Sequence, residues 1–301
     1  MVRKIKTKIL LLHKTAKIYT IYISFFIVSI LIMYIGINYH TTYMAINNIS
    51  LIGEIKKAKI GNLLNGFEYD LLTFTLDNDI LSMNKERIDN KVNFIKYYKR
   101  FYKDIIIINN EKNLVTGYLD NTKEYLYRDY VVEALNGKTT MSYPINIEGE
   151  WYVDLVGPII DKDKRLGIIA IRISLLELSN YLKNYQQNKN MEIYLVNEDG
   201  YFLTGGKNNL RKIGEENINI NELKHSIDYN PQGIYKNYDN NNVYGRYYDF
   251  SKGNWTLVVE SLQNKSVTRL ILFIGSLIIL LILFLMNKII SIIYKHEGCN
   301  M

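Results

Sequence analysis

The stretch Leu166-Gly167-Ile168-Ile169-Ala170-Ile171-Arg172-Ile173-Ser174 is a clear strand signal, and its one charged side chain is Arg172. Isoleucine is β-branched and favours extended backbone. An arginine inside an apolar strand cannot shed its charge, so it needs an anion nearby. We therefore expect a strand here, with an acidic side chain or an acidic ligand beside Arg172.

Further strand-like runs lie on both sides of this stretch. Residues 150–160 precede it, joined by the charged turn Asp161-Lys162-Asp163-Lys164. After a predicted connecting helix at 175–185, the pattern begins again in smaller form. The other predicted strands are residues 104–108, 114–116, 139–145, 192–197, 201–204, 242–250 and 254–261.

Helical periodicity dominates the region before these strands. Apolar residues recur mostly three or four apart between Ile46 and Phe74, and the chain has no proline before Pro144. This spacing predicts a long helix starting near residue 41 and a second helical stretch at 85–102. A short helix is predicted at 127–136, ended by Gly137. The fold class is therefore predicted to be α+β.

Two long apolar runs flank this region. Residues 18–39 contain no charged side chain, and as a helix they would reach about 33 Å, enough to cross a bilayer core. Residues 270–286 are also free of charge and predict a second span over 268–294. A cleaved signal peptide is the alternative for the first run, but its apolar core is too long and no cleavage pattern follows it.

Charge sets the predicted orientation. Residues 1–17 hold six basic side chains and no acidic one, which favours a cytoplasmic location for this flank. We expect a two-pass protein of the cell membrane, with residues 1–17 and the tail 295–301 in the cytoplasm and the region between the spans outside the cell. The net charge of +7 then owes most of its excess to the flank, so no nucleic-acid partner is expected.

Catalytic and metal-binding patterns are weak in this sequence. The four histidines are scattered, and neither a metal-ligand spacing nor a phosphate-binding glycine loop is recognisable. The single cysteine, Cys299, lies in the predicted tail, so no disulfide is expected outside the cell. We expect a protein that is not an enzyme and has no cofactor or metal.

Several motifs occur in the order typical of one family. Residues 127–138 (YRDYVVEALNGK) resemble the pocket-edge motif of double Cache sensor domains, and 158–160 with 166–174 resemble the closing strand pair. Residues 192–200 and 253–260 resemble the opening and the end of the membrane-proximal module. The resemblance covers about residues 41–265.

The resemblance implies a long stalk helix carrying two PAS-like modules. The stalk and helical part would occupy 41–102, a membrane-distal module 103–185 and a membrane-proximal module 186–265. In this family the distal module usually binds a small ligand, and the proximal one transmits the signal to histidine kinases, chemoreceptors or diguanylate cyclases. A homodimer through the stalk helix is implied as well.

Two arginines are the main candidates for ligand contact. Arg172 lies where many amine-binding relatives have an acidic residue, and Arg128 lies at the arginine of the pocket-edge motif. A guanidinium suits a carboxylate in two-point contact. The alternatives are an internal ion pair of Arg172 with Asp154 or Glu133, and a surface position for Arg128.

Three further residues complete the predicted ligand site. Tyr130 replaces the usual aromatic of the motif, while alternation places Tyr152 and Asp154 on one face of their strand. Val131 departs from the tyrosine of the amino-acid-binding pattern. We therefore favour a small organic acid over an amino acid or amine.

Three functions remain open from the sequence. The first is a sensor that passes its signal to a separate cytoplasmic or membrane protein. The second is a surface binding or scaffold protein without a signalling role. The third is a truncated receptor that has lost its kinase, cyclase or chemotaxis output domain.

Overall fold

The protein is described here from a computed structural model, which covers residues 2–183, 190–205, 212–230, 233–263 and 265–298. The chain divides into two compact units. Residues Ile46–Leu262 form one, which we call the sensor domain, and Met1–Ala45 with Gln263–Met301 form the other, the terminal unit.

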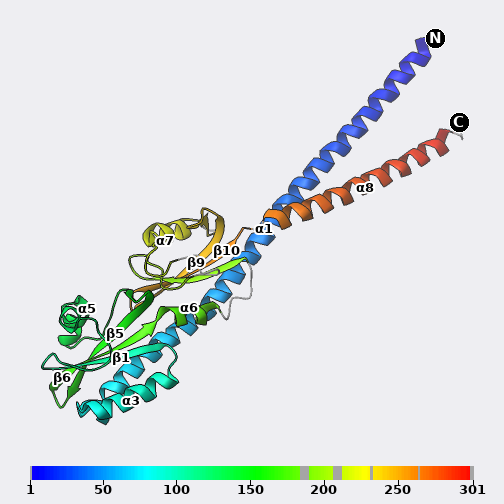
Figure 1. The fold of residues 1–301 in the computed structure, drawn as a ribbon. Coiled ribbons are helices and arrows are strands. Elements are labelled where there is room, and N and C mark those ends of the chain that lie inside the picture. Colours follow the sequence, from blue (N-terminus) through cyan, green and yellow to red (C-terminus); the bar gives the residue numbers. More distant parts are fainter. Residues whose placement is uncertain (1, 184–189, 206–211, 231–232, 264, 299–301) are drawn as a thin grey trace. The chain divides into compact units, whose positions relative to one another are not determined.

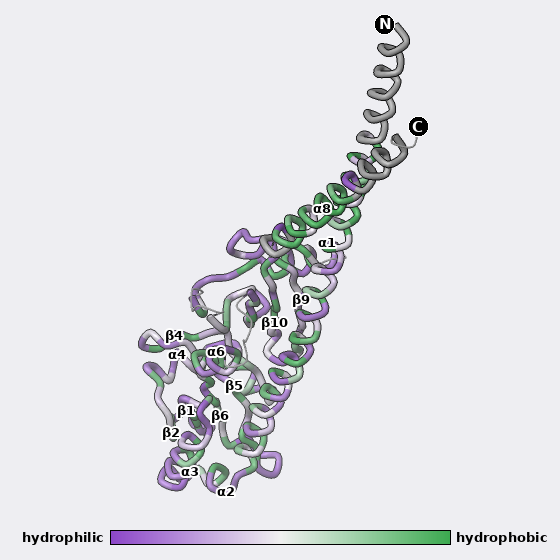
Figure 2. The backbone as a smooth tube through the Cα atoms, turned by 90° about the vertical axis from the view of Figure 1, so that its right-hand side faces the viewer, coloured by the Kyte–Doolittle hydropathy of each residue, from purple (hydrophilic) through white to green (hydrophobic). Residues whose placement is uncertain are grey.

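The terminal unit contains the first part of α1 (Val2–Thr75) and α8 (Lys265–Gly298). Among the described residues, one helix is long and apolar enough to cross a membrane, the segment Thr20–Thr75 of α1. Helix α8 contains a shorter apolar segment, Arg269–Leu285. In Figure 2, green marks many hydrophobic residues in the coloured part of α8. The two-pass topology therefore stays a prediction.

The first sheet of the sensor domain has six antiparallel strands in the order β2-β1-β6-β5-β3, with β4 also paired to β5 (Figure 1). The predicted strand at 166–174 becomes β6, between β1 and β5. The strands are β1 (Tyr102–Asn109), β2 (Leu114–Thr116), β3 (Thr140–Met141), β4 (Ile145–Ile147), β5 (Glu150–Asp161) and β6 (Lys164–Ser174).

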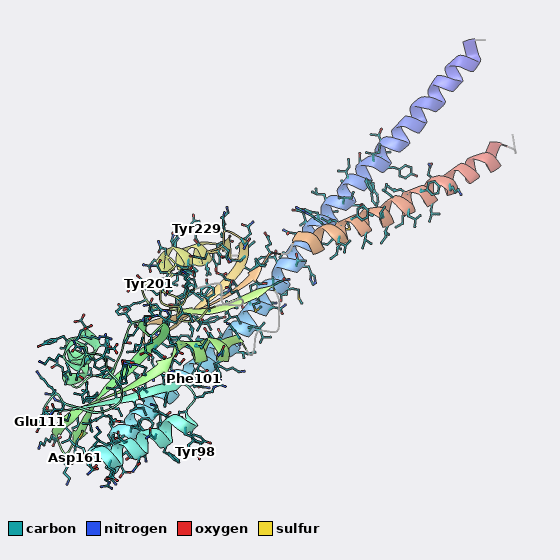
Figure 3. The ribbon with its side chains drawn as sticks, in the orientation of Figure 1. Tyr98, Phe101, Glu111, Asp161, Tyr201 and Tyr229 are labelled. Atoms are coloured by element: carbon teal, nitrogen blue, oxygen red, sulfur yellow. The ribbon has the colours of Figure 1, made fainter. Side chains whose placement is uncertain are left out.

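A tight two-residue turn joins β5 and β6. Lys162 and Asp163 both have positive φ, 45° and 66°, as a two-residue hairpin turn with the twist of its strands requires. A Cβ at Gly167 would lie 2.1 Å from the carbonyl oxygen of Ile108, so glycine permits close pairing with β1. In Figure 3, Glu111 and Asp161 mark the two turns at this end of the sheet.

Helices cover both faces of the first sheet, so its central strands are apolar at successive positions. On one face α1 packs with α2 (Asn78–Leu81) and α3 (Lys85–Tyr98); on the other lie α4 (Thr122–Leu126) and α5 (Asp129–Leu135). The second face carries one apolar cluster: Ile106, Ile108, Tyr125, Leu126, Val131, Ala134, Val156, Ile168 and Ala170.

A second, four-stranded sheet follows helix α6 (Leu175–Lys183) and has the order β7-β10-β9-β8. Helix α7 (Ile220–Tyr229) covers an apolar cluster on one of its faces. The strands are β7 (Met191–Val196), β8 (Ile234–Lys236), β9 (Asn242–Phe250) and β10 (Trp255–Leu262).

The two sheets are joined by side-chain contacts as well as by the chain. The Tyr143 hydroxyl, just before β4, donates to Glu198 at 2.8 Å, and Asn254 donates to the other oxygen of the same carboxylate at 2.7 Å. Trp151 of β5 packs against Gly214, where a Cβ would lie 2.3 Å from the indole ring.

Lys56 holds α1 against α6. Its buried ammonium donates to the carbonyl oxygen of Leu182 at 3.1 Å, in the last turn of α6, where a positive charge is favourable. Burial, with a smaller effect from Lys59, lowers the pKa of Lys56 to about 8.

The lowered pKa of Lys56 predicts a pH-dependent stability. Above about pH 8 the folded chain has released a proton that the unfolded chain keeps up to about pH 10, so stability should rise with pH in this window. We expect Lys56→Met to remove about 1 kcal/mol of this rise, measured by urea unfolding between about pH 8 and pH 9.5. Lys57→Met, on the exposed side of α1, is the control. Equal slopes for wild type and Lys56→Met would contradict the prediction.

Candidate functional site

A row of three charged residues crosses the three middle strands of the first sheet near one end of them. Asp104 of β1 and Asp154 of β5 both stand opposite Arg172 of β6 in the strand registers. Directly opposed residues point to the same face of a sheet. All three therefore lie on the face covered by α4 and α5, at the end of its apolar cluster.

Arg172 and Asp154 form a buried two-point ion pair. The Nε and Nη2 groups of Arg172 donate to the two Asp154 oxygens at 2.9 and 3.0 Å. Arg172 is 3% exposed and Asp154 is 0% exposed. Burial acts to lower the pKa of Arg172, but its hydrogen bonds with Asp154 and the charge of that carboxylate outweigh burial and raise it.

Further hydrogen bonds fix the Asp154 side of this pair. The hydroxyl of Tyr125, from α4, donates to Asp154 at 3.0 Å, and burial raises the pKa of this tyrosine. The main chain of Asp154 is held by Ser142: its N–H donates to the Ser142 Oγ at 2.8 Å, and its carbonyl oxygen accepts from the Ser142 N–H at 2.9 Å.

The loop after β2 closes over the other side of Arg172. The Tyr118 N–H donates to Asp104 at 2.7 Å, and its carbonyl oxygen accepts from Arg172 Nη1 at 3.2 Å. Lys96 of α3 also bonds Asp104, at 2.8 Å. Gly117 makes this close approach feasible, because it has φ +90° and a Cβ there would lie 2.7 Å from the Ile105 carbonyl oxygen.

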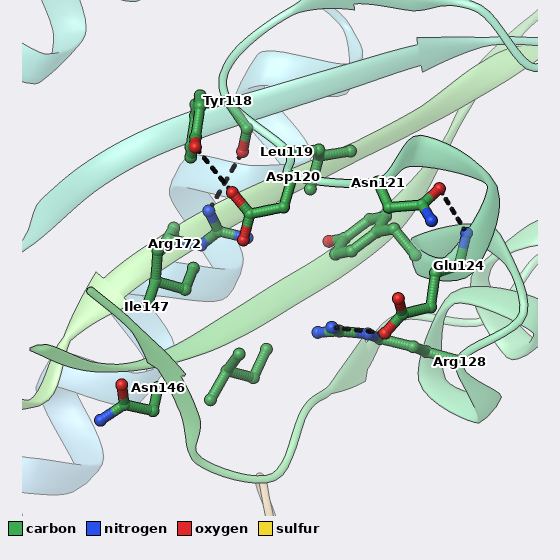
Figure 4. Close-up of a pocket in the computed structure, with 11 residues that line it drawn as sticks. Tyr118, Leu119, Asp120, Asn121, Glu124, Arg128, Asn146, Ile147 and Arg172 are labelled. Carbon is green, nitrogen blue, oxygen red and sulfur yellow. Dashed lines mark hydrogen bonds and ion pairs between the residues drawn. The ribbon is translucent and has the colours of Figure 1, made fainter. Parts of the chain in front are cut away.

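A cavity of about 100 Å³ opens beside this row (Figure 4). Arg172 enters its wall from β6, and Arg128 enters from the N-terminal end of α5. The complete lining is Tyr118, Leu119, Asp120, Asn121, Glu124, Tyr125, Arg128, Ile145, Asn146, Ile147 and Arg172.

Arg128 is less tightly held than Arg172. Its Nη1 donates to the Tyr130 hydroxyl at 3.3 Å, its guanidinium lies 5.6 Å from the centre of the Tyr125 ring, and Glu124 is 3.8 Å away. Because Arg128 is half-buried and Glu124 is exposed, a ligand carboxylate can take the place of this weak pair.

The structure places Arg128 and Arg172, the two arginines that the sequence suggested for ligand contact, in the wall of one cavity. Asp154 lies behind Arg172 as its ion-pair partner. Tyr130 packs edge-on against Tyr125, with ring centres 6.1 Å apart, and Tyr152 bonds Glu150; neither is among the lining residues. Their predicted contact with ligand stays a prediction.

Sequence reasoning missed most of the remaining wall. Tyr118 and Asp120 come from the loop after Gly117, and Asn146 comes from β4. Asn121 and Glu124 had a readable signal, because an asparagine followed three residues later by glutamate is typical of a helix start. Asn121 does cap α4, accepting from the main-chain N–H groups of Lys123 and Glu124.

The wall carries charges of both signs. Arg172 is neutralised by Asp154, while Asp120 and Glu124 face the same cavity as Arg128. Such a site can bind a carboxylate at Arg128, with donors and acceptors for polar groups around it. Across the described residues, no group of three or more histidine, cysteine or acidic side chains could hold a metal ion.

Comparison with known proteins places this architecture in a family. A family model described as Cache domain, of the double Cache type, matches residues 40–270. A comparison with curated protein sequences found no match.

Solved structures with a similar fold include sensor domains of chemoreceptors. Methyl-accepting Chemotaxis protein X has a TM-score of 0.58 at 13% identity, covering 74% of this chain and 100% of that one. The ligand-binding domain of the Pseudomonas fluorescens chemoreceptor CtaA, in complex with L-isoleucine, has a TM-score of 0.55 at 13% identity, covering 75% and 96%. The Pseudomonas aeruginosa PAO1 amino-acid chemoreceptor PctB, in complex with L-Arg, has a TM-score of 0.55 at 14% identity, covering 75% and 90%.

Proposed function

Because this chain belongs to the double Cache family of sensor domains, we propose that it is a membrane-anchored sensor of a small carboxylate-bearing molecule. The observation that carries this proposal is the cavity between the first sheet and α4–α5, into which Arg128 presents a weakly paired guanidinium. The cavity is smaller than the roughly 300–1,000 Å³ of sites for drug-sized ligands, so the ligand has few heavy atoms.

Arg128 rather than Arg172 is the carboxylate contact in this proposal. Arg172 already bonds both oxygens of Asp154 and the Tyr118 carbonyl oxygen. A ligand that displaced Asp154 would leave that carboxylate buried without its charge partner, which is strongly unfavourable. Arg172 therefore supports the site by fixing Tyr118 and the loop that contributes Asp120.

An organic acid and an amino acid are the two ligand classes to separate. The resemblance favours an organic acid, because Arg172 and Val131 stand where relatives that bind amines or amino acids have an acidic residue and a tyrosine. Asp120 and Glu124 on the wall favour an ammonium group beside the carboxylate, and CtaA and PctB were solved with amino acids. The organic acid remains our first candidate, and the amino acid is the second.

Transmission of the signal is proposed to run through both ends of the sensor domain. Helix α1 enters it from the first predicted span, and β10 leaves it toward the second. In this proposal the chain is a homodimer through α1, and a separate signalling protein reads the change. A scaffold protein or a truncated receptor would bind the same ligand but would produce no output.

A thermal-shift screen of the purified segment 41–266 tests ligand binding. At about 100-fold saturation a bound carboxylate should add about 2.7 kcal/mol of stability. Arg128→Gln should abolish most of this shift, whereas Arg165→Gln, at an exposed position of β6, should leave it intact. Paired organic and amino acids of equal chain length separate the two classes. A shift that survives in Arg128→Gln, or a response to neutral sugars alone, would refute the carboxylate site.

A further inference from the structure

A second cavity lies on the side of the first sheet that α1 and α3 cover, away from α4 and α5. Its volume is about 310 Å³, which falls at the lower end of the roughly 300–1,000 Å³ of small-molecule sites. Helix α1 forms one wall with Leu63 and Gly66, and the turn that joins α3 to β1 forms the other with Tyr98 and Arg100. We call this the α1 cavity.

Aromatic rings line the interior of the α1 cavity. Phe67 of α1 and Tyr102 of β1 are buried, with ring centres 5.8 Å apart, and Phe101 packs edge-on against Phe67 at 5.7 Å. At the rim, Tyr98 is exposed, but its ring lies 4.8 Å from that of Phe94. Tyr98 and Phe101 are both labelled in Figure 3. Such an interior suits a flat apolar body, above all an aromatic ring.

Asp70 bonds the two walls of the α1 cavity to each other. Its carboxylate, on α1, accepts from Lys99 Nζ at 2.8 Å and from the Tyr102 hydroxyl at 2.5 Å. The Tyr102 N–H donates to the Lys99 carbonyl oxygen at 2.8 Å, which closes the turn. The wall shape is therefore fixed by groups of this chain, and the charges of Asp70 and Lys99 cancel.

Arg100 differs from its basic neighbours because it has no acidic partner. Residues 91–103 contain five basic side chains. Four of them pair with a carboxylate: Lys91 with Asp77, Lys96 with Asp104, Lys99 with Asp70 and Lys103 with Glu150. Within the described part of the chain, the Arg100 guanidinium forms no ion pair and lies 5.0 Å from the centre of the Phe101 ring. The α1 cavity thus keeps one positive charge, whose planar fork suits a carboxylate.

We propose that the α1 cavity is a second ligand site, which binds a small aromatic carboxylate. The ring lies among Phe67, Phe101 and Tyr98, and the carboxylate bonds Arg100. Gly66 leaves room for the ring, because among the described residues beyond the helix itself no atom lies within 4 Å of a Cβ built there.

This second site goes beyond the proposed function, because it uses neither Arg128 nor the cavity that Arg128 lines. An acid bound here contacts α1 directly, and α1 is the helix that leads to the first predicted span. No residue of α1 lines the first cavity. The two sites therefore act on different elements of the sensor domain.

Equilibrium dialysis of labelled phenylacetate against the full chain in nanodiscs tests the α1 cavity, with empty nanodiscs subtracted. An Arg128→Gln background removes the carboxylate contact of the first cavity. Arg100→Gln should raise the dissociation constant roughly tenfold or more, whereas Arg165→Gln, also exposed, should leave it unchanged. Gly66→Leu should abolish binding by filling the cavity, and Thr73→Leu, exposed on the same helix, should not.

Two matched probes separate the ring from the charge. Phenylacetamide keeps the ring without the charge, and acetate keeps the carboxylate without the ring, so each should displace labelled phenylacetate only weakly. Three outcomes would overturn the inference: no saturable binding of phenylacetate in the Arg128→Gln background, displacement by phenylacetamide as strong as by phenylacetate, or unchanged affinity in Arg100→Gln. Arg100 is exposed, so its replacement reports on binding even where Gly66→Leu disturbs the packing. Because the first cavity is tested through Arg128, failure of one site is distinguishable from failure of the other.

Discussion

Replacing Asp154 by alanine is expected to lower the free energy of unfolding of the sensor domain by about 3–5 kcal/mol. The change leaves the guanidinium of Arg172 buried without a counter-charge and removes the acceptor of the Tyr125 hydroxyl. Urea unfolding of the segment 41–266, followed by circular dichroism, measures the loss. The effect is large because Arg172 cannot shed its proton to escape the low-dielectric site.

A double variant separates the effect of the ion pair on stability from that of the surrounding packing. Asp154→Leu with Arg172→Met replaces both charges by apolar groups and should be less destabilising than either single change, because no buried charge is left unpaired. Asp104→Ala is the matched control in the same row, since Arg172 then keeps Asp154. A loss below about 1 kcal/mol for Asp154→Ala would mean that water reaches Arg172.

Replacing Glu260 by alanine is expected to destabilise the sensor domain by about 2–4 kcal/mol. Glu260 of β10 is 1% exposed. Its carboxylate accepts from the Tyr194 hydroxyl at 2.7 Å, the Tyr235 hydroxyl at 2.5 Å and the Asn237 amide at 3.1 Å. Alanine leaves these three buried donors without their acceptor, whereas glutamine keeps an acceptor oxygen.

Glutamine at position 260 should also change the pH dependence of stability. Burial raises the pKa of Glu260, and the charge of Glu192, directly opposite on β7, adds to this. The folded chain then holds the proton more tightly than the unfolded chain. This stabilisation is complete below the ordinary glutamate pKa and is lost as pH rises through the folded-state pKa.

Urea midpoints measured from acidic to neutral pH check this sign. Wild type should lose stability relative to Glu260→Gln as pH rises, and Glu215→Gln, at an exposed position, should follow wild type. Parallel curves for wild type and Glu260→Gln would show that the three donors hold the carboxylate ionised throughout.

Most of the strands were predictable from the sequence. The predicted strand 201–204 is wrong, because only isolated bridges form at Tyr201 and Phe202, and strand β8 was not predicted. A third difference has a physical reason. Residues 139–145 read as one strand but form β3 and part of β4, both paired with β5. Between β3 and β4, the N–H and the hydroxyl oxygen of Ser142 form hydrogen bonds with the main chain of Asp154. Pro144 lacks an N–H for a ladder, so the pairing is interrupted there.

The two arginines of the site were predictable from the sequence, whereas the groups that they bond to were not. The alternation of side chains along a strand predicts which face of the sheet a residue lies on. The residue opposite it on the next strand depends on the strand register, so the choice between Asp154 and Glu133 as the ion-pair partner of Arg172 stayed open. Register selects Asp154 and adds Asp104 on the other side. Tyr118 contributes through its main chain, which no side-chain pattern can indicate. Tyr152 shares the face of Asp154, but its hydroxyl bonds Glu150.

The two-residue bridge Ser142-Tyr143 has a mechanical consequence. Two hydrogen bonds tie Ser142 to the main chain of Asp154, one through the Ser142 N–H and one through its Oγ. The next side chain, Tyr143, donates to Glu198, which also accepts from Asn254 just before β10. A shift of β5 at Asp154 must therefore either drag this bridge along or break its bonds. These bonds therefore couple the position of the second sheet to that of the charge row in the first.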